Sequence, residues 1–265
     1  MNPKVDQVQR PETKKAPEHL NKLQIKKKFK ASETQEVATN YDSDEDKEKT
    51  LDFDKEIQNI KNLQGVDLAF CVDTTGSMKP FMKSIKELMR KIIRDGENFV
   101  KQFEKSKDLF KVAVVAYRDH DDEKQKDSYL TSKVDFCDGN SARAFLKTLE
   151  AKGGFDKAEA VIDGLKEVVE LKWRKDSQKF LIHFLDGPPH GTEYGPDQRF
   201  GSECPCKLAE DDIFYPMRDL NLKYSIIKLN DDIDLMLKRY SEFFVIEVVK
   251  LDISYDQNEK NTQQY

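Results

Sequence analysis

Oxygen-bearing side chains gather in the loops that follow apolar segments of this sequence. Asp73 ends one apolar segment, Thr75 and Ser77 come shortly after it, and Asp186 ends another. Asp156 lies in a Gly-Gly-Phe-Asp turn between the two segments. If these loops meet, their carboxylate and hydroxyl oxygens would suit a hard divalent cation such as Mg²⁺. They would suit Zn²⁺ less well, because zinc prefers nitrogen and sulfur ligands.

The segments before these loops read as buried strands separated by helices. Near-continuous apolar runs at 66–73, 110–117 and 179–186 are typical of strands buried on both faces of a parallel sheet. Apolar residues at spacings of three and four predict helices over 78–103 and 157–171. This alternation predicts an α/β fold with a doubly wound, mostly parallel central sheet and helices on both faces. Because ligands bind beyond the carboxyl ends of strands in such sheets, the oxygen-bearing loops are expected at one edge.

Further elements complete the expected fold. The segment 129–137 alternates between apolar and polar residues, which predicts a half-exposed edge strand, and we expect it to be antiparallel. A helix is expected at 142–149. Towards the C-terminus, strands at 223–229 and 243–251 flank a helix at 231–240.

Composition divides the chain into a polar tail and one domain. Charged residues make up 36% of the sequence and hydrophobic residues 37%, whereas globular domains contain roughly 45–50% apolar residues. The deficit is concentrated in residues 1–50, which we interpret as a disordered charged tail. Residues 51–65 predict an N-terminal helix and linker that would cover part of the sheet. Residues 66–251 form the expected domain, and 252–265 a polar C-terminal tail.

The same composition excludes several classes of protein. No apolar run approaches the roughly 20 residues that a transmembrane helix requires, and the N-terminus lacks the apolar core of a signal peptide. Four cysteines do not make a disulfide scaffold, so we expect reduced thiols and a cytoplasmic location. The net charge of −5 offers no general attraction for nucleic acid, which is therefore not an expected partner.

Four short motifs resemble a known family. The Asp-Thr-Thr-Gly-Ser segment at 73–77 resembles the Asp-x-Ser/Thr-x-Ser signature of von Willebrand factor A domains, which forms the metal-ion-dependent adhesion site. Tyr-Arg-Asp at 117–119, Gly-Gly-Phe-Asp at 153–156 and Asp-Gly-Pro-Pro-His-Gly at 186–191 resemble the intracellular branch found beside alpha-kinases. The similarity covers roughly residues 66–250. The resemblance implies the Rossmann-like fold of that family.

The resemblance also implies a set of metal ligands. Thr75 and Ser77 would offer hydroxyl oxygens directly to Mg²⁺, Mn²⁺ or Ca²⁺, and Asp73 and Asp186 would bind the ion directly or through waters. Asp156 stands where many A domains supply a threonine. The additional negative charge implies that the metal is retained without a partner and attracts a partner's carboxylate less strongly than in integrin-like domains.

Two neighbouring residues are expected to support the metal loops. Arg118 and Asp119 follow the second apolar segment, and we interpret them as bracing these loops through hydrogen bonds. The next three residues, 120–122, read as a polar turn with no role of their own.

The segment 187–207 is long and predicts a loop that binds a partner. His190 lies near its start, and Cys204 and Cys206 near its end. A Cys-x-Cys pair with a histidine could hold zinc, but a fourth ligand is missing unless His183 or a partner supplies it. His183 lies inside a predicted strand and reads as a core residue. We therefore favour a partner-docking loop.

The favoured function is a non-catalytic binding module that docks a protein partner, or a large protein complex, through the cation and surrounding loops. No enzyme is expected, because the sequence has neither a Gly-x-Ser-x-Gly elbow nor a Walker motif. One alternative is a structural subunit, an intracellular scaffold with a vestigial metal site. A remote alternative is a phosphotransferase of the haloacid-dehalogenase type, although Thr75 stands where its second aspartate is needed. The basic-apolar segment 19–30 is a further candidate for docking.

Overall fold

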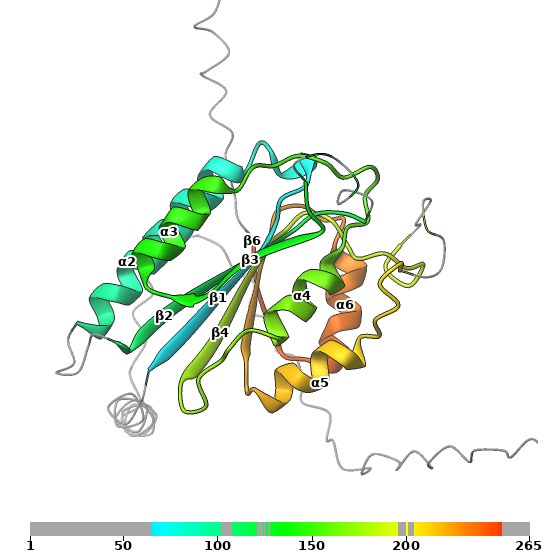
Figure 1. The fold of residues 1–265 in the computed structure, drawn as a ribbon. Helices are drawn as coiled ribbons and strands as arrows, with labels where there is room; N and C mark the ends of the chain where they lie inside the picture. The colour runs from blue at the N-terminus through cyan, green and yellow to red at the C-terminus, as the bar shows by residue number, and fades with distance from the viewer. Residues whose placement is uncertain are drawn as a thin grey trace, which may run out of the picture. The chain divides into compact units, whose positions relative to one another are not determined.

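Six strands form one sheet in the order β3-β2-β1-β4-β5-β6 (Figure 1). The computed structural model describes residues 65–101, 108–120, 124, 126, 128–195, 200 and 204–250. All neighbouring strands pair in parallel except β2 and β3, which are antiparallel, so the sheet has one antiparallel edge strand. This confirms the predicted fold class. The strands are β1 (Val66–Asp73), β2 (Phe110–Tyr117), β3 (Thr131–Cys137), β4 (Gln178–Leu185), β5 (Lys223–Lys228) and β6 (Ile246–Lys250).

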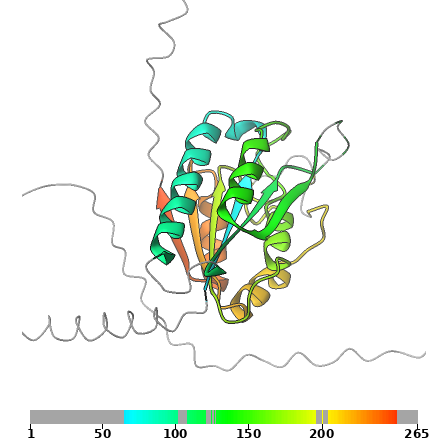
Figure 2. The ribbon, with the colours of Figure 1, turned by 60° about the vertical axis from the view of Figure 1, so that its left-hand side comes forward.

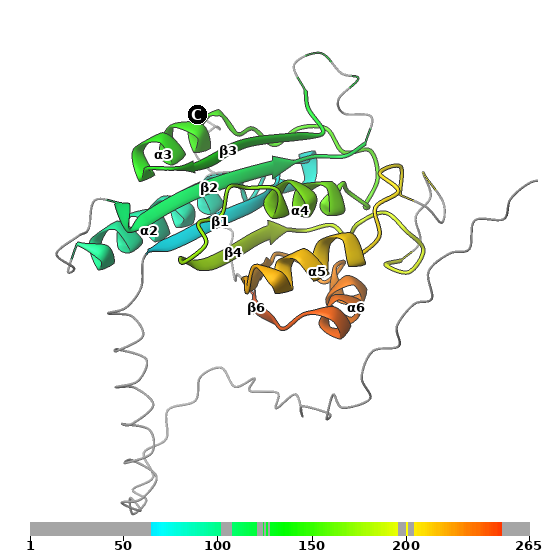
Figure 3. The ribbon, with the colours of Figure 1, turned by 60° about the horizontal axis from the view of Figure 1, so that its bottom comes forward.

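Helices cover both faces of the sheet (Figures 2 and 3). One face is covered by α2 (Met82–Val100) and α3 (Gly139–Thr148), the other by α4 (Val161–Val169), α5 (Asp211–Asp219) and α6 (Asp234–Phe243). Side chains of β1 alternate between the two cores: Phe70 packs with α2, and Cys71 packs with α4. Burial on both faces explains why this strand reads as a continuous apolar run.

Helix α4 lies against the sheet at very short range. Gly164 faces the ring of Tyr117 on β2, and a β-carbon added at this glycine would lie 2.4 Å from the Tyr117 Cδ1 atom. A side chain at this position would therefore force the helix and the ring apart. Glycine here sets the close spacing between α4 and the sheet.

Several boundaries differ from the sequence-based prediction. Helix α5 was not predicted, because it is only nine residues long and contains Pro216, which lacks the backbone donor of a helix interior. The first long helix begins at Met82, after a 3₁₀ turn, η1 (Gly76–Met78), that follows β1. The last strand begins at Ile246, because Phe243 still belongs to α6.

Some expectations lie outside the described residues. These are the tail at 1–50, the helix predicted within 51–65 and the polar segment 252–265, so the division into a domain and tails stays a prediction. Of the helices that the structure does describe, none is both long and apolar enough to cross a bilayer.

The strand order reverses its direction beside β1. The chain moves from β1 to β2 on one side, and later places β4 on the other side of β1. At such a reversal the connections leave in opposite directions, and ligands of open α/β sheets bind outside the carboxyl ends of the two strands. Asp73 ends β1, and Asp186 follows the last residue of β4. The fold therefore brings these two aspartates to the same edge.

Candidate metal centre

The loop after β1 folds back on the last residue of that strand. The backbone N–H of Thr75 donates to Asp73 Oδ1 at 2.8 Å, and the Thr75 hydroxyl donates to the same oxygen at 2.7 Å. Both residues are fully buried. The carboxylate thus orients the two-residue turn that leads into η1.

Ser77 connects this turn to the end of β4. Its hydroxyl donates to Asp186 Oδ1 at 3.0 Å and lies 3.2 Å from the Thr75 hydroxyl. The contact between the two hydroxyls is itself of hydrogen-bond length, and either hydroxyl could be its donor. The side-chain oxygens of Thr75 and Ser77 therefore lie side by side between the two carboxylates.

A close backbone approach brings the turn at 153–156 to the same loop. The N–H of Gly76 donates to the carbonyl of Gly153 at 2.9 Å. A β-carbon at Gly76 would lie 2.8 Å from that carbonyl oxygen, so only glycine allows this approach. The hydrogen bond fixes the position of the turn that carries Asp156.

Glu159 is a member of the site that the sequence did not reveal. It is 3% exposed, and its N–H donates to the carbonyl of Pro188 at 2.9 Å, beyond the end of β4. Burial, followed by the charges of Asp73 and Asp119, raises the pKa of its carboxyl well above the ordinary value. A glutamate just before a helix reads as an ordinary helix-terminal charge, so no motif marked it. We call Asp73, Thr75, Ser77, Glu159 and Asp186 the oxygen site.

The carboxyl groups of the oxygen site are buried close to one another. Burial and the charge of Asp186 raise the pKa of Asp73, and burial raises the pKa of Asp186. Asp73 Oδ2 is a buried atom with no hydrogen-bond partner among the described residues. Gathering several carboxylates without a counter-charge is unfavourable, and a divalent cation would supply that charge.

The spacing of the oxygens suits a small cation. Mg²⁺ binds oxygens at roughly 2.0–2.1 Å in an octahedron, which places neighbouring ligands about 2.9 Å apart. The three separations along the series Asp73, Thr75, Ser77 and Asp186 are 2.7, 3.2 and 3.0 Å. Two hydroxyls and several carboxylates are the oxygen donors that a hard divalent cation takes, so these residues could hold such an ion.

Asp156 lies in a group with Asp119 and His190. One ligand atom of each residue lies within 4.8 Å of the others. Asp119 Oδ1 and His190 Nε2 are 2.7 Å apart, and both side chains are fully buried. His190 therefore supports Asp119 from within the protein, and its side chain is not presented to a partner. The role of Asp156 as a direct ligand stays a prediction.

Arg118 connects two loops near the site. Its guanidinium donates to the Ser128 hydroxyl at 2.6 Å and to the Glu150 carbonyl at 3.0 Å, and it lies 4.0 Å from the centroid of the Tyr129 ring. Glu150 immediately precedes the segment that carries Asp156. These contacts join two loops, and the support of the metal loops by Arg118 stays a prediction.

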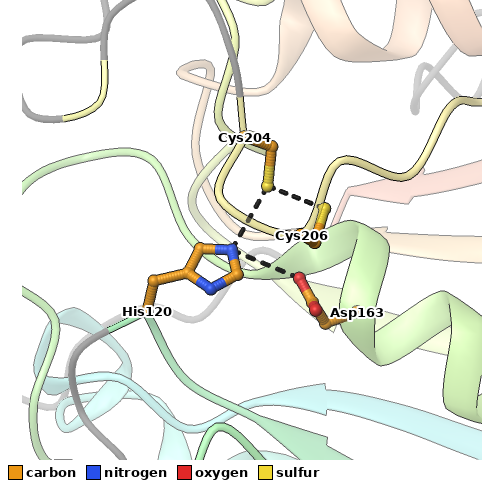
Figure 4. Close-up of side chains that lie close together, drawn as sticks. All are labelled: His120, Asp163, Cys204 and Cys206. Atoms are coloured by element: carbon orange, nitrogen blue, oxygen red, sulfur yellow. Dashed lines mark hydrogen bonds and ion pairs between the residues drawn. The ribbon is translucent and has the colours of Figure 1, made fainter.

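The cysteines of the predicted docking loop lie in a second cluster (Figure 4). Cys204 and Cys206 lie against His120 and Asp163, and we call these four residues the thiol site. Burial acts to lower the pKa of His120, but hydrogen bonding to Asp163 and Cys206 outweighs it and raises the value to about 9. The hydrogen bond with Cys204 lowers the pKa of Cys206 to about 6. His120 was expected to have no role, and its place in this cluster corrects that expectation.

His183 is a core residue, as predicted. It is fully buried, and its two ring nitrogens lie 2.9 Å from the Tyr117 hydroxyl and 2.8 Å from the Tyr224 hydroxyl. Burial lowers its pKa to about 3, so the ring is neutral at physiological pH. His183 takes no part in either cluster.

Comparison with known proteins gives two partial relatives. The alpha-protein kinase vwkA of Dictyostelium discoideum is 31% identical over 176 residues, which cover 64% of this chain and 26% of the kinase. The putative ariadne-like RING finger protein R811 of Acanthamoeba polyphaga mimivirus is 30% identical over 161 residues, which cover 58% of this chain and 14% of that protein. The chain thus spans about a quarter of the kinase and a smaller share of the RING finger protein. No family model matches it.

A solved structure shares the fold. The pilus adhesin SpaC from Lactobacillus rhamnosus GG, in an open conformation, aligns with 72% of this chain and 28% of its own at a TM-score of 0.50. The sequence identity is 13%, so this likeness concerns the fold alone. Together with the kinase relative, it supports a von Willebrand factor A-like fold.

One expectation is corrected by these relatives. The sequence was expected not to belong to an enzyme, because it lacks familiar catalytic motifs. The vwkA relative is an alpha-protein kinase, so this chain shares a segment with an enzyme. Missing motifs were a poor guide, because a segment covering 26% of an enzyme need not contain its catalytic residues.

Proposed function

We propose that this chain is a von Willebrand factor A-type module that binds a protein partner through Mg²⁺ held at the oxygen site. In this proposal Thr75 and Ser77 ligate the ion through their hydroxyls. Asp73, Glu159 and Asp186 supply the negative charge, directly or through waters. The partner completes the coordination of the ion, as the resemblance to metal-ion-dependent adhesion sites implies.

The observation that carries the proposal is the oxygen series at the strand ends. Asp73 Oδ2 is buried without a hydrogen-bond partner among the described residues, and the Thr75 and Ser77 oxygens face each other. Hydrogen bonding within the loop leaves Asp73 Oδ2 unsatisfied. A cation bound by these oxygens would satisfy it.

One side of the site is open to a partner. Asp73 and Thr75 are fully buried, whereas Ser77 is exposed. On the turn that contacts this loop, Phe155 is 57% exposed. A partner that reached the ion past Ser77 would therefore also meet an aromatic side chain. A ring next to a charged centre is the kind of anchor that protein interfaces favour.

The comparisons support a module within a larger protein. The kinase and the RING finger protein each contain the matching segment as a minor part of their length. The two relatives have different names, yet both contain this segment. A binding module that occurs in both proteins explains this more simply than a catalytic role that would have to serve both. The reduced state of the four cysteines is consistent with the cytoplasmic location that forms part of this proposal.

The test separates the metal from the rest of the surface. Wild-type chain is immobilised, stripped with EDTA, and exposed to source lysate with or without restored Mg²⁺ while Zn²⁺ is held constant. We expect a set of proteins to be retained only with Mg²⁺, and to be lost with Asp73→Ala. Asp95→Ala is the matched control, because Asp95 is an exposed residue of α2 that pairs only with surface side chains.

Two results would contradict the proposal. If Mg²⁺ leaves the melting temperature of the wild type unchanged, the oxygen site holds no magnesium. If the same proteins are retained in EDTA, the partner does not dock at the metal, and a scaffold that binds through another surface is favoured.

A further inference from the structure

The thiol site brings together four side chains from three distant segments. His120 follows β2, Asp163 lies in the first turn of α4, and Cys204 and Cys206 precede α5. One ligand atom of each lies within 4.8 Å of all the others. Figure 4 shows the ring nitrogen of His120 pointing between Asp163 and the two sulfur atoms.

The distances at the centre of this cluster are short. His120 Nε2 lies 3.2 Å from Cys204 Sγ and 3.3 Å from Asp163 Oδ2, and the two sulfur atoms are 2.9 Å apart. The Oδ2 atom of Asp163 is buried, and its contact with His120 Nε2 competes with the contact between that nitrogen and Cys204. His120 Nε2 carries at most one hydrogen, so it cannot satisfy both the sulfur and the carboxylate.

These donors have the chemistry of a zinc site. We propose that His120, Asp163, Cys204 and Cys206 bind one Zn²⁺ ion, which ties the loops after β2 and before α5 to helix α4. Two thiolates, one imidazole and one carboxylate form a set that zinc accepts and that magnesium does not favour. The oxygen site has the opposite composition, so the two sites select different metals.

The geometry requires little adjustment for zinc. Tetrahedral zinc, with roughly 2.3 Å to sulfur and 2.0–2.2 Å to nitrogen and oxygen, places neighbouring ligand atoms about 3.3–3.8 Å apart. The distance from His120 Nε2 to Asp163 Oδ2 lies at the lower end of this range, and the distance to Cys204 Sγ is just below it. The sulfur–sulfur distance would have to lengthen by less than about 1 Å, which small side-chain rotations provide.

Four protein ligands leave no position for a substrate, so the site would be structural. It lies beside the oxygen site: the rings of His120 and His190 are 5.4 Å apart between centroids, and His190 bonds Asp119. Zinc would therefore hold the predicted docking loop in place without contacting the partner. This role does not depend on magnesium binding or on the proposed partner.

The test begins with the full chain purified without chelator. Elemental analysis should find about one zinc per chain in the wild type. The metal should be lost in Cys204→Ser/Cys206→Ser and in His120→Ala. Cys137→Ser is the matched control, because Cys137 is also half-buried and unpaired but lies at the end of β3. Asp73→Ala should keep the zinc, which separates this site from the oxygen site.

A spectroscopic measurement on the wild type avoids any dependence on how the variants fold. Co²⁺ added to the stripped chain should give the visible bands and the sulfur-to-cobalt charge transfer of a tetrahedral, two-thiolate site, and Zn²⁺ should displace them. Absence of these bands would overturn the proposal. So would zinc retained by Cys204→Ser/Cys206→Ser, or a Cys204–Cys206 disulfide found by mass spectrometry in freshly isolated protein.

Discussion

Strand β1 carries a buried aspartate at each end, and the chain neutralises only one of them. Asp67, near the start of the strand, accepts from the Arg174 guanidinium at 2.7 Å, from the Arg174 N–H at 2.8 Å and from the Ser177 hydroxyl at 2.7 Å. Asp73, at the end of the strand, accepts hydrogen bonds from the backbone N–H and the hydroxyl of Thr75. No basic side chain of the described residues forms an ion pair with Asp73.

The two ends differ in where the counter-charge comes from. Both aspartates are fully buried in the same strand, so burial alone does not distinguish them. At the first end the protein supplies its own cation, which makes the charge part of the fold. At the second end the proposed function assigns the counter-charge to an ion from solvent, which can bind and leave.

The largest expected effect is at the paired end. Asp67→Asn leaves the partly exposed Arg174 charge without its partner. Breaking one side of a buried ion pair costs about 3–5 kcal/mol, and the exposure of Arg174 places this pair at the lower end, about 3 kcal/mol. The free energy of unfolding from urea denaturation should fall by that amount, with or without Mg²⁺. A loss below about 1 kcal/mol would mean that Arg174 is compensated by solvent and that the two ends are alike.

The next largest effect is that of the ion itself. With Mg²⁺ at 100 times its dissociation constant, the wild type should gain about 2.7 kcal/mol by mass action. A scan of melting temperature against Mg²⁺ concentration measures this gain. Asp73→Asn should remove it, and Asp67→Asn should retain it. If Asp73→Asn responds to Mg²⁺ as the wild type does, the counter-charge does not come from this ion.

Without metal, Asp73→Asn at the end of β1 should change the free energy of unfolding only slightly. Asp73→Asn in EDTA removes a charge that repels Asp186 and Glu159 but keeps an oxygen acceptor for Thr75. The stability should therefore stay within about 1 kcal/mol of the wild type, or rise by that much. A loss comparable to that of Asp67→Asn would show that Asp73 already has a counter-charge in the apo protein.

The smallest effect is expected at Asp95, because the charge of an exposed aspartate is already solvated by water. Asp95 on α2 is half exposed and pairs with Lys91 one helical turn earlier. Pairs of this kind contribute about 0.3–0.5 kcal/mol, so Asp95→Ala should change the unfolding free energy by no more than that. A larger loss of unfolding free energy would indicate that the burial of an aspartate does not determine how much it contributes to stability.

Sequence reasoning predicted the residues of one site better than the other. Thr75 and Ser77 follow Asp73 within four positions, and a strand-end rule added Asp186. These residues are contiguous or are placed by the sheet, so periodicity and a short motif are enough to predict that they meet. Their role as ligands stays a prediction. Glu159 was missed because its approach depends on how the chain before α4 turns beside Pro188, which no local pattern encodes.

The thiol site could not be predicted for a related reason. Its Cys-x-Cys pair was noticed, but it was paired with His190 instead of His120. His120 is separated from Cys204 by 84 positions, and both lie in loops. Their meeting depends on the paths of two loops over the sheet edge, and those paths are set by tertiary packing. Asp163 looked like a normal acidic residue in the first turn of a helix.

The absence of a side chain at Gly164 sets the distance between α4 and the sheet. A β-carbon at this position would lie 2.4 Å from the Tyr117 ring, so any larger residue would require α4 or the ring to move. Asp163 is the preceding residue on that helix, and His120 lies three positions after Tyr117. The distance between α4 and the sheet therefore determines whether the Asp163 carboxylate and the His120 imidazole can bind the same ion. A methyl group at Gly164 would push α4 away from the sheet and increase the distance between Asp163 and His120, the proposed zinc ligands on either side.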